Sequence, residues 1–183
     1  MTSPWSPETY MAAARFAAEA HQRTGKAVPG THLPYFYHVC LVAMEVTRAL
    51  SVEDGHDGDL AVQCALLHDV LEDTPVSVRR LAAHFGAAVA AGVQALTKDP
   101  AISQKDARMR DSLARIRRQP PSVWLVKLAD RIVNLQPPPS DWRADKIALY
   151  GQEARVILDA LAAASPHLAR RLADKISGYG RPG

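Results

Sequence analysis

The stretch LAVQCALLHDVLEDT, residues 60–74, begins with apolar residues typical of a protein core and ends with titratable residues. Its first half is mostly apolar and helical in character, yet His68, Asp69, Glu72 and Asp73 follow directly. Burying an unpaired charge costs several kcal/mol, so something must compensate such groups. Water, partner side chains and a metal ion are the three candidates that this segment leaves open.

Helical periodicity continues along nearly the whole chain, and no β-strand alternation or internal repeat is found. Ser6, Ser77 and Ser140 are expected helix caps, an aspartate before Leu60 caps another helix, and proline or glycine follows most helix ends. The expected helices cover residues 7–25, 34–50, 59–73, 77–85, 87–97, 104–118, 122–135, 141–164 and 166–177. We predict an all-α fold, with one domain over residues 1–183 and a frayed tail over residues 178–183.

Composition narrows the class of protein. The 183 residues are 48% hydrophobic and 22% charged, as in a soluble globular domain. No secretory signal or membrane span is expected, so the cytoplasm is the predicted location. A net charge of +3 is too weak to imply nucleic acid, and the arginine-rich segment 108–118 is interpreted as a solvated helix face. Cys40 and Cys64 are predicted to be buried free thiols.

Polar groups interrupt two further apolar segments. In VWLVKLADRIVNL, residues 123–135, Asp130 and Asn134 lie four residues apart and therefore share a helix face. In LPYFYHVCLVA, residues 33–43, His38 stands among aromatic and aliphatic residues. Each feature also has an ordinary interpretation: His38 as a core residue, Asp130 paired with a neighbouring arginine, and the acidic end of the 60–74 segment as an exposed helix end.

Taken together, two histidines and two aspartates on three helices form a mixed nitrogen and oxygen set. Such a set suits Mn²⁺, Fe²⁺ or Mg²⁺ with open coordination positions, whereas structural zinc more often recruits cysteines. A carboxylate one helical turn from the ligands could accept a proton from water at the ion. The residues therefore indicate metal-assisted hydrolysis.

Five segments carry a resemblance to the HD-domain metal-dependent phosphohydrolases. The matching segments are AHQRTG (20–25), PYFYHVCLVA (34–43), ALLHDVLEDT (65–74), FGAAVAAGVQALTKD (85–99) and VKLADRIVNL (126–135). A weaker match at Trp142, Lys146, Tyr150, Glu153 and Ala154 extends the region of similarity, so that it covers residues 20–154. The chain resembles the hydrolase half of RelA/SpoT enzymes and the small alarmone hydrolases of the stringent response. The resemblance implies a helical bundle with the metal site between helices.

The resemblance also implies roles for individual residues. The implied ion is Mn²⁺, with Fe²⁺, Co²⁺ or Mg²⁺ as alternatives, and Glu72 and Asp73 are implied to position and activate the attacking water. The implied metal ligands are His38, His68, Asp69 and Asp130. The implied substrate contacts are Arg23, Lys105, Asn134, Lys146 and Tyr150.

The implied reaction removes the 3′-diphosphate of guanosine alarmones, which yields GDP or GTP and pyrophosphate. Three departures from the family pattern border the expected pocket: Thr24 where a lysine is usual, a longer loop over residues 26–32, and a compact connection over residues 136–141. They keep two alternatives open, a hydrolase of another phosphorylated nucleotide such as NADPH or a nucleoside monophosphate, and a non-catalytic nucleotide sensor. The oligomeric state stays open, a homodimer included.

Overall fold

The computed structural model describes residues 4–139 and 141–180. Within these ranges the regular structure is helical, apart from one isolated β-bridge between Ala27 and Pro34, so the all-α prediction is confirmed. The elements are α1 (Pro7–Gln22), α2 (Phe36–Leu50), α3 (Gly58–Leu67), α4 (Val70–Asp73), α5 (Val78–Leu96), α6 (Lys105–Ile116), α7 (Pro121–Asn134), α8 (Ala144–Leu161), the 3₁₀ turn η1 (Ala162–Ala164) and α9 (Pro166–Gly178). None of these helices is long and apolar enough to cross a membrane.

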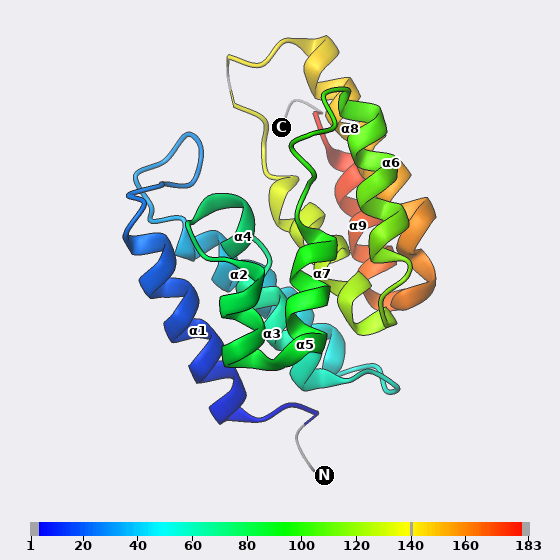
Figure 1. Cartoon of the computed structure of the whole chain (residues 1–183). Coiled ribbons are helices and arrows are strands. Elements are labelled where there is room, and N and C mark those ends of the chain that lie inside the picture. Colours follow the sequence, from blue (N-terminus) through cyan, green and yellow to red (C-terminus); the bar gives the residue numbers. More distant parts are fainter. Residues whose placement is uncertain (1–3, 140, 181–183) are drawn as a thin grey trace.

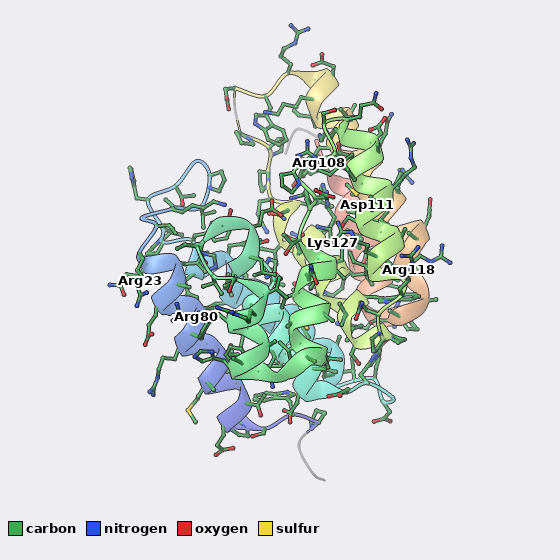
Figure 2. All side chains as sticks on the ribbon, in the orientation of Figure 1. Arg23, Arg80, Arg108, Asp111, Arg118 and Lys127 are labelled. Atoms are coloured by element: carbon green, nitrogen blue, oxygen red, sulfur yellow. The ribbon has the colours of Figure 1, made fainter. Side chains whose placement is uncertain are left out.

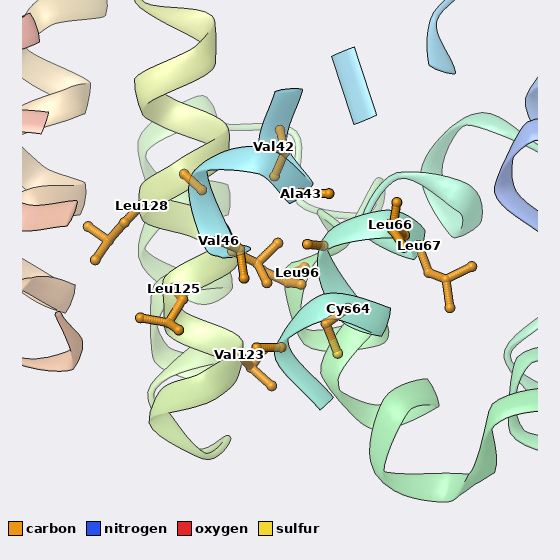
Figure 3. Packing of buried hydrophobic residues seen from close by; sticks show 14 of the residues in the cluster. Val42, Ala43, Val46, Cys64, Leu66, Leu67, Leu96, Val123, Leu125 and Leu128 are labelled. Carbon is orange, nitrogen blue, oxygen red and sulfur yellow. The ribbon is translucent and has the colours of Figure 1, made fainter. Parts of the chain in front are cut away.

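Helix α7 is the central packing element. It contacts α2 and α3 on one side and α8 and α9 on the other, and Figure 1 shows α1 at one edge of the molecule with α6, α8 and α9 at the opposite edge. Val46 of α2, Cys64 of α3 and Leu125 of α7 are fully buried and belong to one hydrophobic cluster (Figure 3). Burial of each such aliphatic side chain stabilises the fold by about 1.5–3 kcal/mol.

The helix predicted over residues 59–73 differs from the observed structure at both ends. Its cap is Asp57, whose carboxylate accepts a hydrogen bond from the Leu60 amide at 3.0 Å, while Asp59 instead accepts one from the Ser6 amide at 2.7 Å. The helix stops at Leu67, and α4 begins at Val70. The backbone of Asp69 leaves the helical region, with φ −102° and ψ 0°. The break separates the side chain of His68 from those of α4.

The other boundaries follow the sequence more closely. Gly86, with φ +85°, interrupts α5 where a helix end was predicted. The long helix expected from residue 141 begins at Ala144, and its expected cap, Ser140, lies outside the described residues. In the tail, Tyr179 packs against Tyr150 with ring centroids 5.9 Å apart, and residues 181–183 also lie outside the described residues. Cys40, which is half-buried, and Cys64 are both free.

Helix α5 approaches the core through Gly92. A Cβ atom at this position would lie 2.7 Å from Cys64 Sγ and 3.1 Å from Val123 Cγ2, both inside the packed interior. We therefore expect Gly92→Ala to lower the free energy of unfolding by about 1–3 kcal/mol, measured by urea denaturation. The expected sign is opposite to that of helix propensity, which favours alanine over glycine by about 1 kcal/mol.

Gly151→Ala in α8 is the matched control. Among the described residues, its Cβ would come within 4 Å of Tyr179 Cδ1 alone, at an ordinary contact distance of 3.7 Å. The control should therefore be neutral or stabilising. Equal destabilisation of the two variants would show that crowding at Gly92 is not the cause.

Candidate functional site

A cavity of about 350 Å³ lies between the α3–α4 junction and helices α6, α7 and α8, and its walls are mostly titratable. In Figure 2, Arg108 of α6 and Lys127 of α7 lie near the middle of the view, whereas Arg23 lies at the left edge of the molecule. The lining side chains with ionisable groups are Lys26, Tyr35, His68, Asp69, Glu72, Asp73, Lys98, Lys105, Arg108, Lys127, Asp130, Arg131, Tyr150 and Glu153.

Four side chains, from α2, the α3–α4 junction and α7, converge beside this cavity, and three of them line it. His38, His68 and Asp130 are buried, and each offers a ligand atom within 4.8 Å of the other two. Asp69 Oδ2 lies beside this group, 3.0 Å from His68 Nε2 and 3.9 Å from His38 Nε2. All four predicted metal ligands are thus neighbours, with Asp69 at the margin of the group.

The donor set fits a divalent ion. His68 Nδ1 lies 2.8 Å from the carbonyl oxygen of Ala65, so this nitrogen donates outward and Nε2 is left facing the other ligands. The Nε2 atoms of His38 and His68 are buried, and each lies beside a carboxylate oxygen: Asp130 Oδ1 is 3.5 Å from His38 Nε2, and Asp69 Oδ2 is 3.0 Å from His68 Nε2. Buried nitrogen and carboxylate oxygen atoms at this spacing can share either protons or a metal ion, and a divalent ion bound by such mixed donors would offset the negative charge of both carboxylates.

The residues of the cluster shift one another's pKa values. Burial alone would lower the pKa of His68, but the neighbouring carboxylates of Asp69 and Asp130 raise it to about 9. Burial alone would likewise raise the pKa of both carboxyl groups, yet His68 holds that of Asp69, and Lys127 and His38 hold that of Asp130, well below the usual range. Without an ion, the proton on His68 balances the ionised carboxylates. A metal ion bound by the cluster would take the place of that proton, since metal ligands must be ionised carboxylates and neutral histidines.

Two neighbours on α7 fix the orientation of Asp130. Lys127 Nζ donates to Oδ2 at 2.9 Å, and Asn134 Nδ2 donates to Oδ1 at 2.5 Å. The spacings i−3 and i+4 place both residues on the face of Asp130. Asn134, for which a nucleotide contact was predicted, borders the cavity while it bonds to this carboxylate. Hydrogen-bond partners of this kind orient a metal-binding side chain and tune its basicity.

The two carboxylates of α4 face the cavity beside the ligand cluster, and each has a lysine partner. Glu72 Oε1 lies 2.9 Å from Lys98 Nζ, and Glu72 Oε2 accepts a hydrogen bond from the Lys98 amide at 3.3 Å. Asp73 Oδ2 lies 2.6 Å from Lys26 Nζ. Both carboxylates are therefore placed to accept a proton inside the cavity.

The opposite wall combines cations with an aromatic ring. Lys105 Nζ lies 2.5 Å from Glu153 Oε1, and the guanidinium carbon of Arg131 lies 4.4 Å from the centroid of the Tyr150 ring. Arg131 is buried, and its Nε and Nη1 atoms have no hydrogen-bond partner in the described ranges. Lys105 and Tyr150 therefore line the cavity, as predicted, beside an arginine with unused donors.

Two predicted substrate contacts do not line the cavity in the described structure. Arg23 caps the end of α1 and borders a separate hollow beside Arg80, and Lys146 Nζ lies 3.9 Å above the ring of Trp142. Several cavity residues were not among the predicted site residues, because isolated charges on separate helices carry no periodic signal. Two had a local clue: Lys127 precedes Asp130 by one helical turn, and Lys98 lies in a segment that carried the resemblance.

Comparisons with known proteins agree with this arrangement. The HD domain family model matches residues 13–165. MESH1 of Mus musculus, named guanosine-3′,5′-bis(diphosphate) 3′-pyrophosphohydrolase, is 32% identical over 165 residues, which cover 87% of this chain and 88% of the relative. MESH1 of Danio rerio, with the same activity in its name, is 34% identical over 155 residues, 80% of each chain.

Solved structures extend the comparison. That of a metazoan ortholog of SpoT, described as hydrolysing ppGpp, matches with a TM-score of 0.79 at 25% identity and covers 94% of this chain and 96% of that chain. A crystal structure from Listeria monocytogenes shares the fold, with a TM-score of 0.63 at 21% identity over 80% of this chain and 98% of that chain.

The ligand cluster makes a direct prediction about metal binding. Asp130→Asn keeps the shape of the side chain but removes its charge, so we expect Mn²⁺ affinity to fall by about 100-fold or more, measured by titration calorimetry. Asp111→Asn, which alters an ion pair on the outside of α6, is the matched control and should keep the affinity of the unmodified protein. Equal Mn²⁺ affinity in both variants would rule out Asp130 as a ligand.

Proposed function

The chain belongs to the HD-domain family, and from this premise we propose that it is a Mn²⁺-dependent hydrolase of guanosine alarmones. The proposed reaction removes the 3′-diphosphate of guanosine 3′,5′-bis(diphosphate) or its pentaphosphate analogue. The observation that carries the proposal is that Glu72 and Asp73 line the same cavity as His68 and Asp130, which form a cluster with His38. The activity named for the MESH1 relatives supports the choice of substrate.

The cavity has the size and charge that such a substrate requires. Its volume of about 350 Å³ lies within the range of small-molecule sites, roughly 300–1,000 Å³. Cationic side chains surround it on two helices and two loops, and phosphate groups are bound by such lysines and arginines. These cations are Lys26, Lys98, Lys105, Arg108, Lys127 and Arg131. A ligand with several phosphate groups would offset their mutual repulsion.

The metal centre would consist of His38, His68, Asp69 and Asp130. When bound there, the ion supplies positive charge that stabilises the transferred phosphoryl group and makes a nearby water more acidic. Mn²⁺ suits the mixed nitrogen and oxygen donors, and Fe²⁺ and Mg²⁺ share this preference to different degrees.

The remaining chemistry belongs to the side chains of α4 and the cavity walls. Glu72 or Asp73 accepts a proton from the water that attacks the 3′-linked phosphorus. The bond between this phosphorus and the ribose 3′-oxygen breaks, the 3′-oxygen takes up a proton, and pyrophosphate leaves. Lysine and arginine side chains hold the phosphates in line for the attack, so positioning and charge do most of the catalytic work. Because the substrate is an intracellular nucleotide, the proposed location is the cytoplasm.

The proposed function predicts pyrophosphate release from ppGpp by the purified protein in the presence of Mn²⁺, with none after chelation by EDTA. Chromatography of the nucleotide products should show GDP. NADPH and nucleoside monophosphates serve as the competing substrates, and their kcat/KM should be lower. A higher kcat/KM for NADPH than for ppGpp would identify NADPH as the better substrate and contradict the proposed one. Tight binding of ppGpp without turnover would show that the protein is a nucleotide sensor and not an enzyme.

The carboxylates of α4 predict a separate effect on turnover. Glu72→Gln and Asp73→Asn keep the shape but remove the proton acceptor, so each should lower kcat by about 10²–10⁴-fold. Mn²⁺ affinity should be retained, since neither residue belongs to the ligand cluster. Glu8→Gln on the exposed start of α1 is the control and should keep the unmodified kcat. Unchanged kcat in both cavity variants would exclude α4 as the source of the base.

A further inference from the structure

The loop between α1 and α2 delivers a lysine to the mouth of the cavity. Lys26 Nζ lies 2.6 Å from Asp73 Oδ2 and 4.0 Å from the centroid of the Tyr35 ring, and all three residues line the cavity. We propose that Lys26 is a phosphate-binding residue of this site and favours nucleotides with a diphosphate over those with a single phosphate. The inference rests on the proposed function and names the group that selects its substrate.

The backbone around Lys26 is fixed by a specific turn. The Thr24 hydroxyl donates to the His21 carbonyl oxygen at 2.8 Å and accepts from the Lys26 amide at 3.2 Å. Gly25, with φ +63°, supplies the left-handed conformation that turns the chain after α1. The Lys26 carbonyl then accepts a hydrogen bond from the Tyr35 amide at 3.0 Å. Lys26 is therefore held on both sides and is not the end of a loose loop.

This turn explains the departure noted at Thr24. Thr24 cannot carry a positive charge, and its hydroxyl is occupied by the turn. Arg23, one residue earlier, borders a different hollow beside Arg80. Among residues 23–26, the side chain that reaches the cavity is that of Lys26. In this chain the cation of the segment that reaches the cavity is thus Lys26, and Thr24 serves as a residue of the turn that precedes it.

The position of Lys26 relative to the ligand cluster identifies which part of the substrate it meets. Tyr35 lies under the ammonium group, and its own hydroxyl donates to Asp69 Oδ2 at 2.5 Å. A single aromatic side chain therefore separates Lys26 from the candidate metal ligands. A phosphate group that contacts Lys26 would be adjacent to the one that reacts at the cluster.

The ammonium group of Lys26 has donors to spare. It carries three N–H groups, and Asp73 is the one salt-bridge partner found for it in the described ranges. With 38% of the side chain exposed, a phosphate can approach from solvent without displacing buried structure. Hydrogen bonds from an ammonium group to phosphate are charge-assisted and therefore strong. Pyrophosphate has more negative charge and more acceptor oxygens than orthophosphate, so its binding should gain more from Lys26.

Binding of inorganic pyrophosphate tests the proposal directly. Titration calorimetry measures the affinity of the unmodified protein and of three variants. Lys26→Met removes the charge and Lys26→Arg keeps it. Lys175→Met, which changes a lysine of α9 outside the cavity, is the control. Lys26→Met should raise the pyrophosphate Kd by about tenfold, with a smaller rise for orthophosphate. Lys26→Arg should restore most of the affinity, and Lys175→Met should match the unmodified protein. Thermal unfolding checks that each variant is folded.

Steady-state kinetics with ppGpp separates this role from a purely structural one. If Lys26 binds phosphate, Lys26→Met raises KM by a similar factor, whereas a residue that only holds Asp73 would lower kcat and leave both KM and the pyrophosphate Kd unchanged. That second result, or no binding of pyrophosphate to the unmodified protein, overturns the proposal for Lys26. Failure of the unmodified protein to hydrolyse ppGpp removes the proposed function instead, because the pyrophosphate Kd is measured independently of the nucleotide.

Discussion

The structure depends on one constraint, the burial of opposite charges inside an apolar helical bundle. His38, His68 and Asp130 are buried side chains from separate helices, packed behind by fully apolar residues of α3 and α7. A single unpaired charge in this position would cost several kcal/mol, so the histidines and carboxylates must compensate one another or a bound ion must compensate them all. The break between α3 and α4 lies at this point of the chain, with His68 and Asp69 at the break and Glu72 and Asp73 on α4 beyond it.

The pairing of charges extends outward from this cluster in layers. Lys127 and Asn134 complete the hydrogen bonding of Asp130, while Lys98 and Lys26 pair with Glu72 and Asp73 nearer the mouth. In the inner layer the charges are buried, and their interactions are strong because little water screens them. At the mouth the lysines are partly exposed and can exchange a carboxylate for a phosphate at low cost. The site is therefore rigid where a metal must be held and adaptable where a polyanion must enter.

The sequence predicts the helical architecture well, because the apolar period of each helix and its caps are local properties. It also predicts which polar residues interrupt the core, since His38 and Asp130 stand out against apolar neighbours. It fails where tertiary contacts decide the outcome. The stop of α3 at Leu67 depends on how His68 turns toward α2 and α7, and no local residue signals it. Arg23 at the end of α1 and Lys26 after the turn at Gly25 are both single cations in a polar segment, and the sequence does not show that Lys26 is the one that reaches the cavity.

Helix α7 joins the stability of the fold to the geometry of the site. Leu125, Leu128 and Ile132 bury one face in the core, while Lys127, Asp130 and Asn134 line the cavity from the other. A carboxylate carried on such a helix inherits the rigidity of close packing, which loops rarely provide. The converse also holds: a cavity or a clash in the core shifts α7 and with it Asp130, and displacements of about 1 Å are enough to slow a reaction by roughly 10²-fold. The hydrophobic core of this protein therefore acts as the outer support of its candidate metal centre.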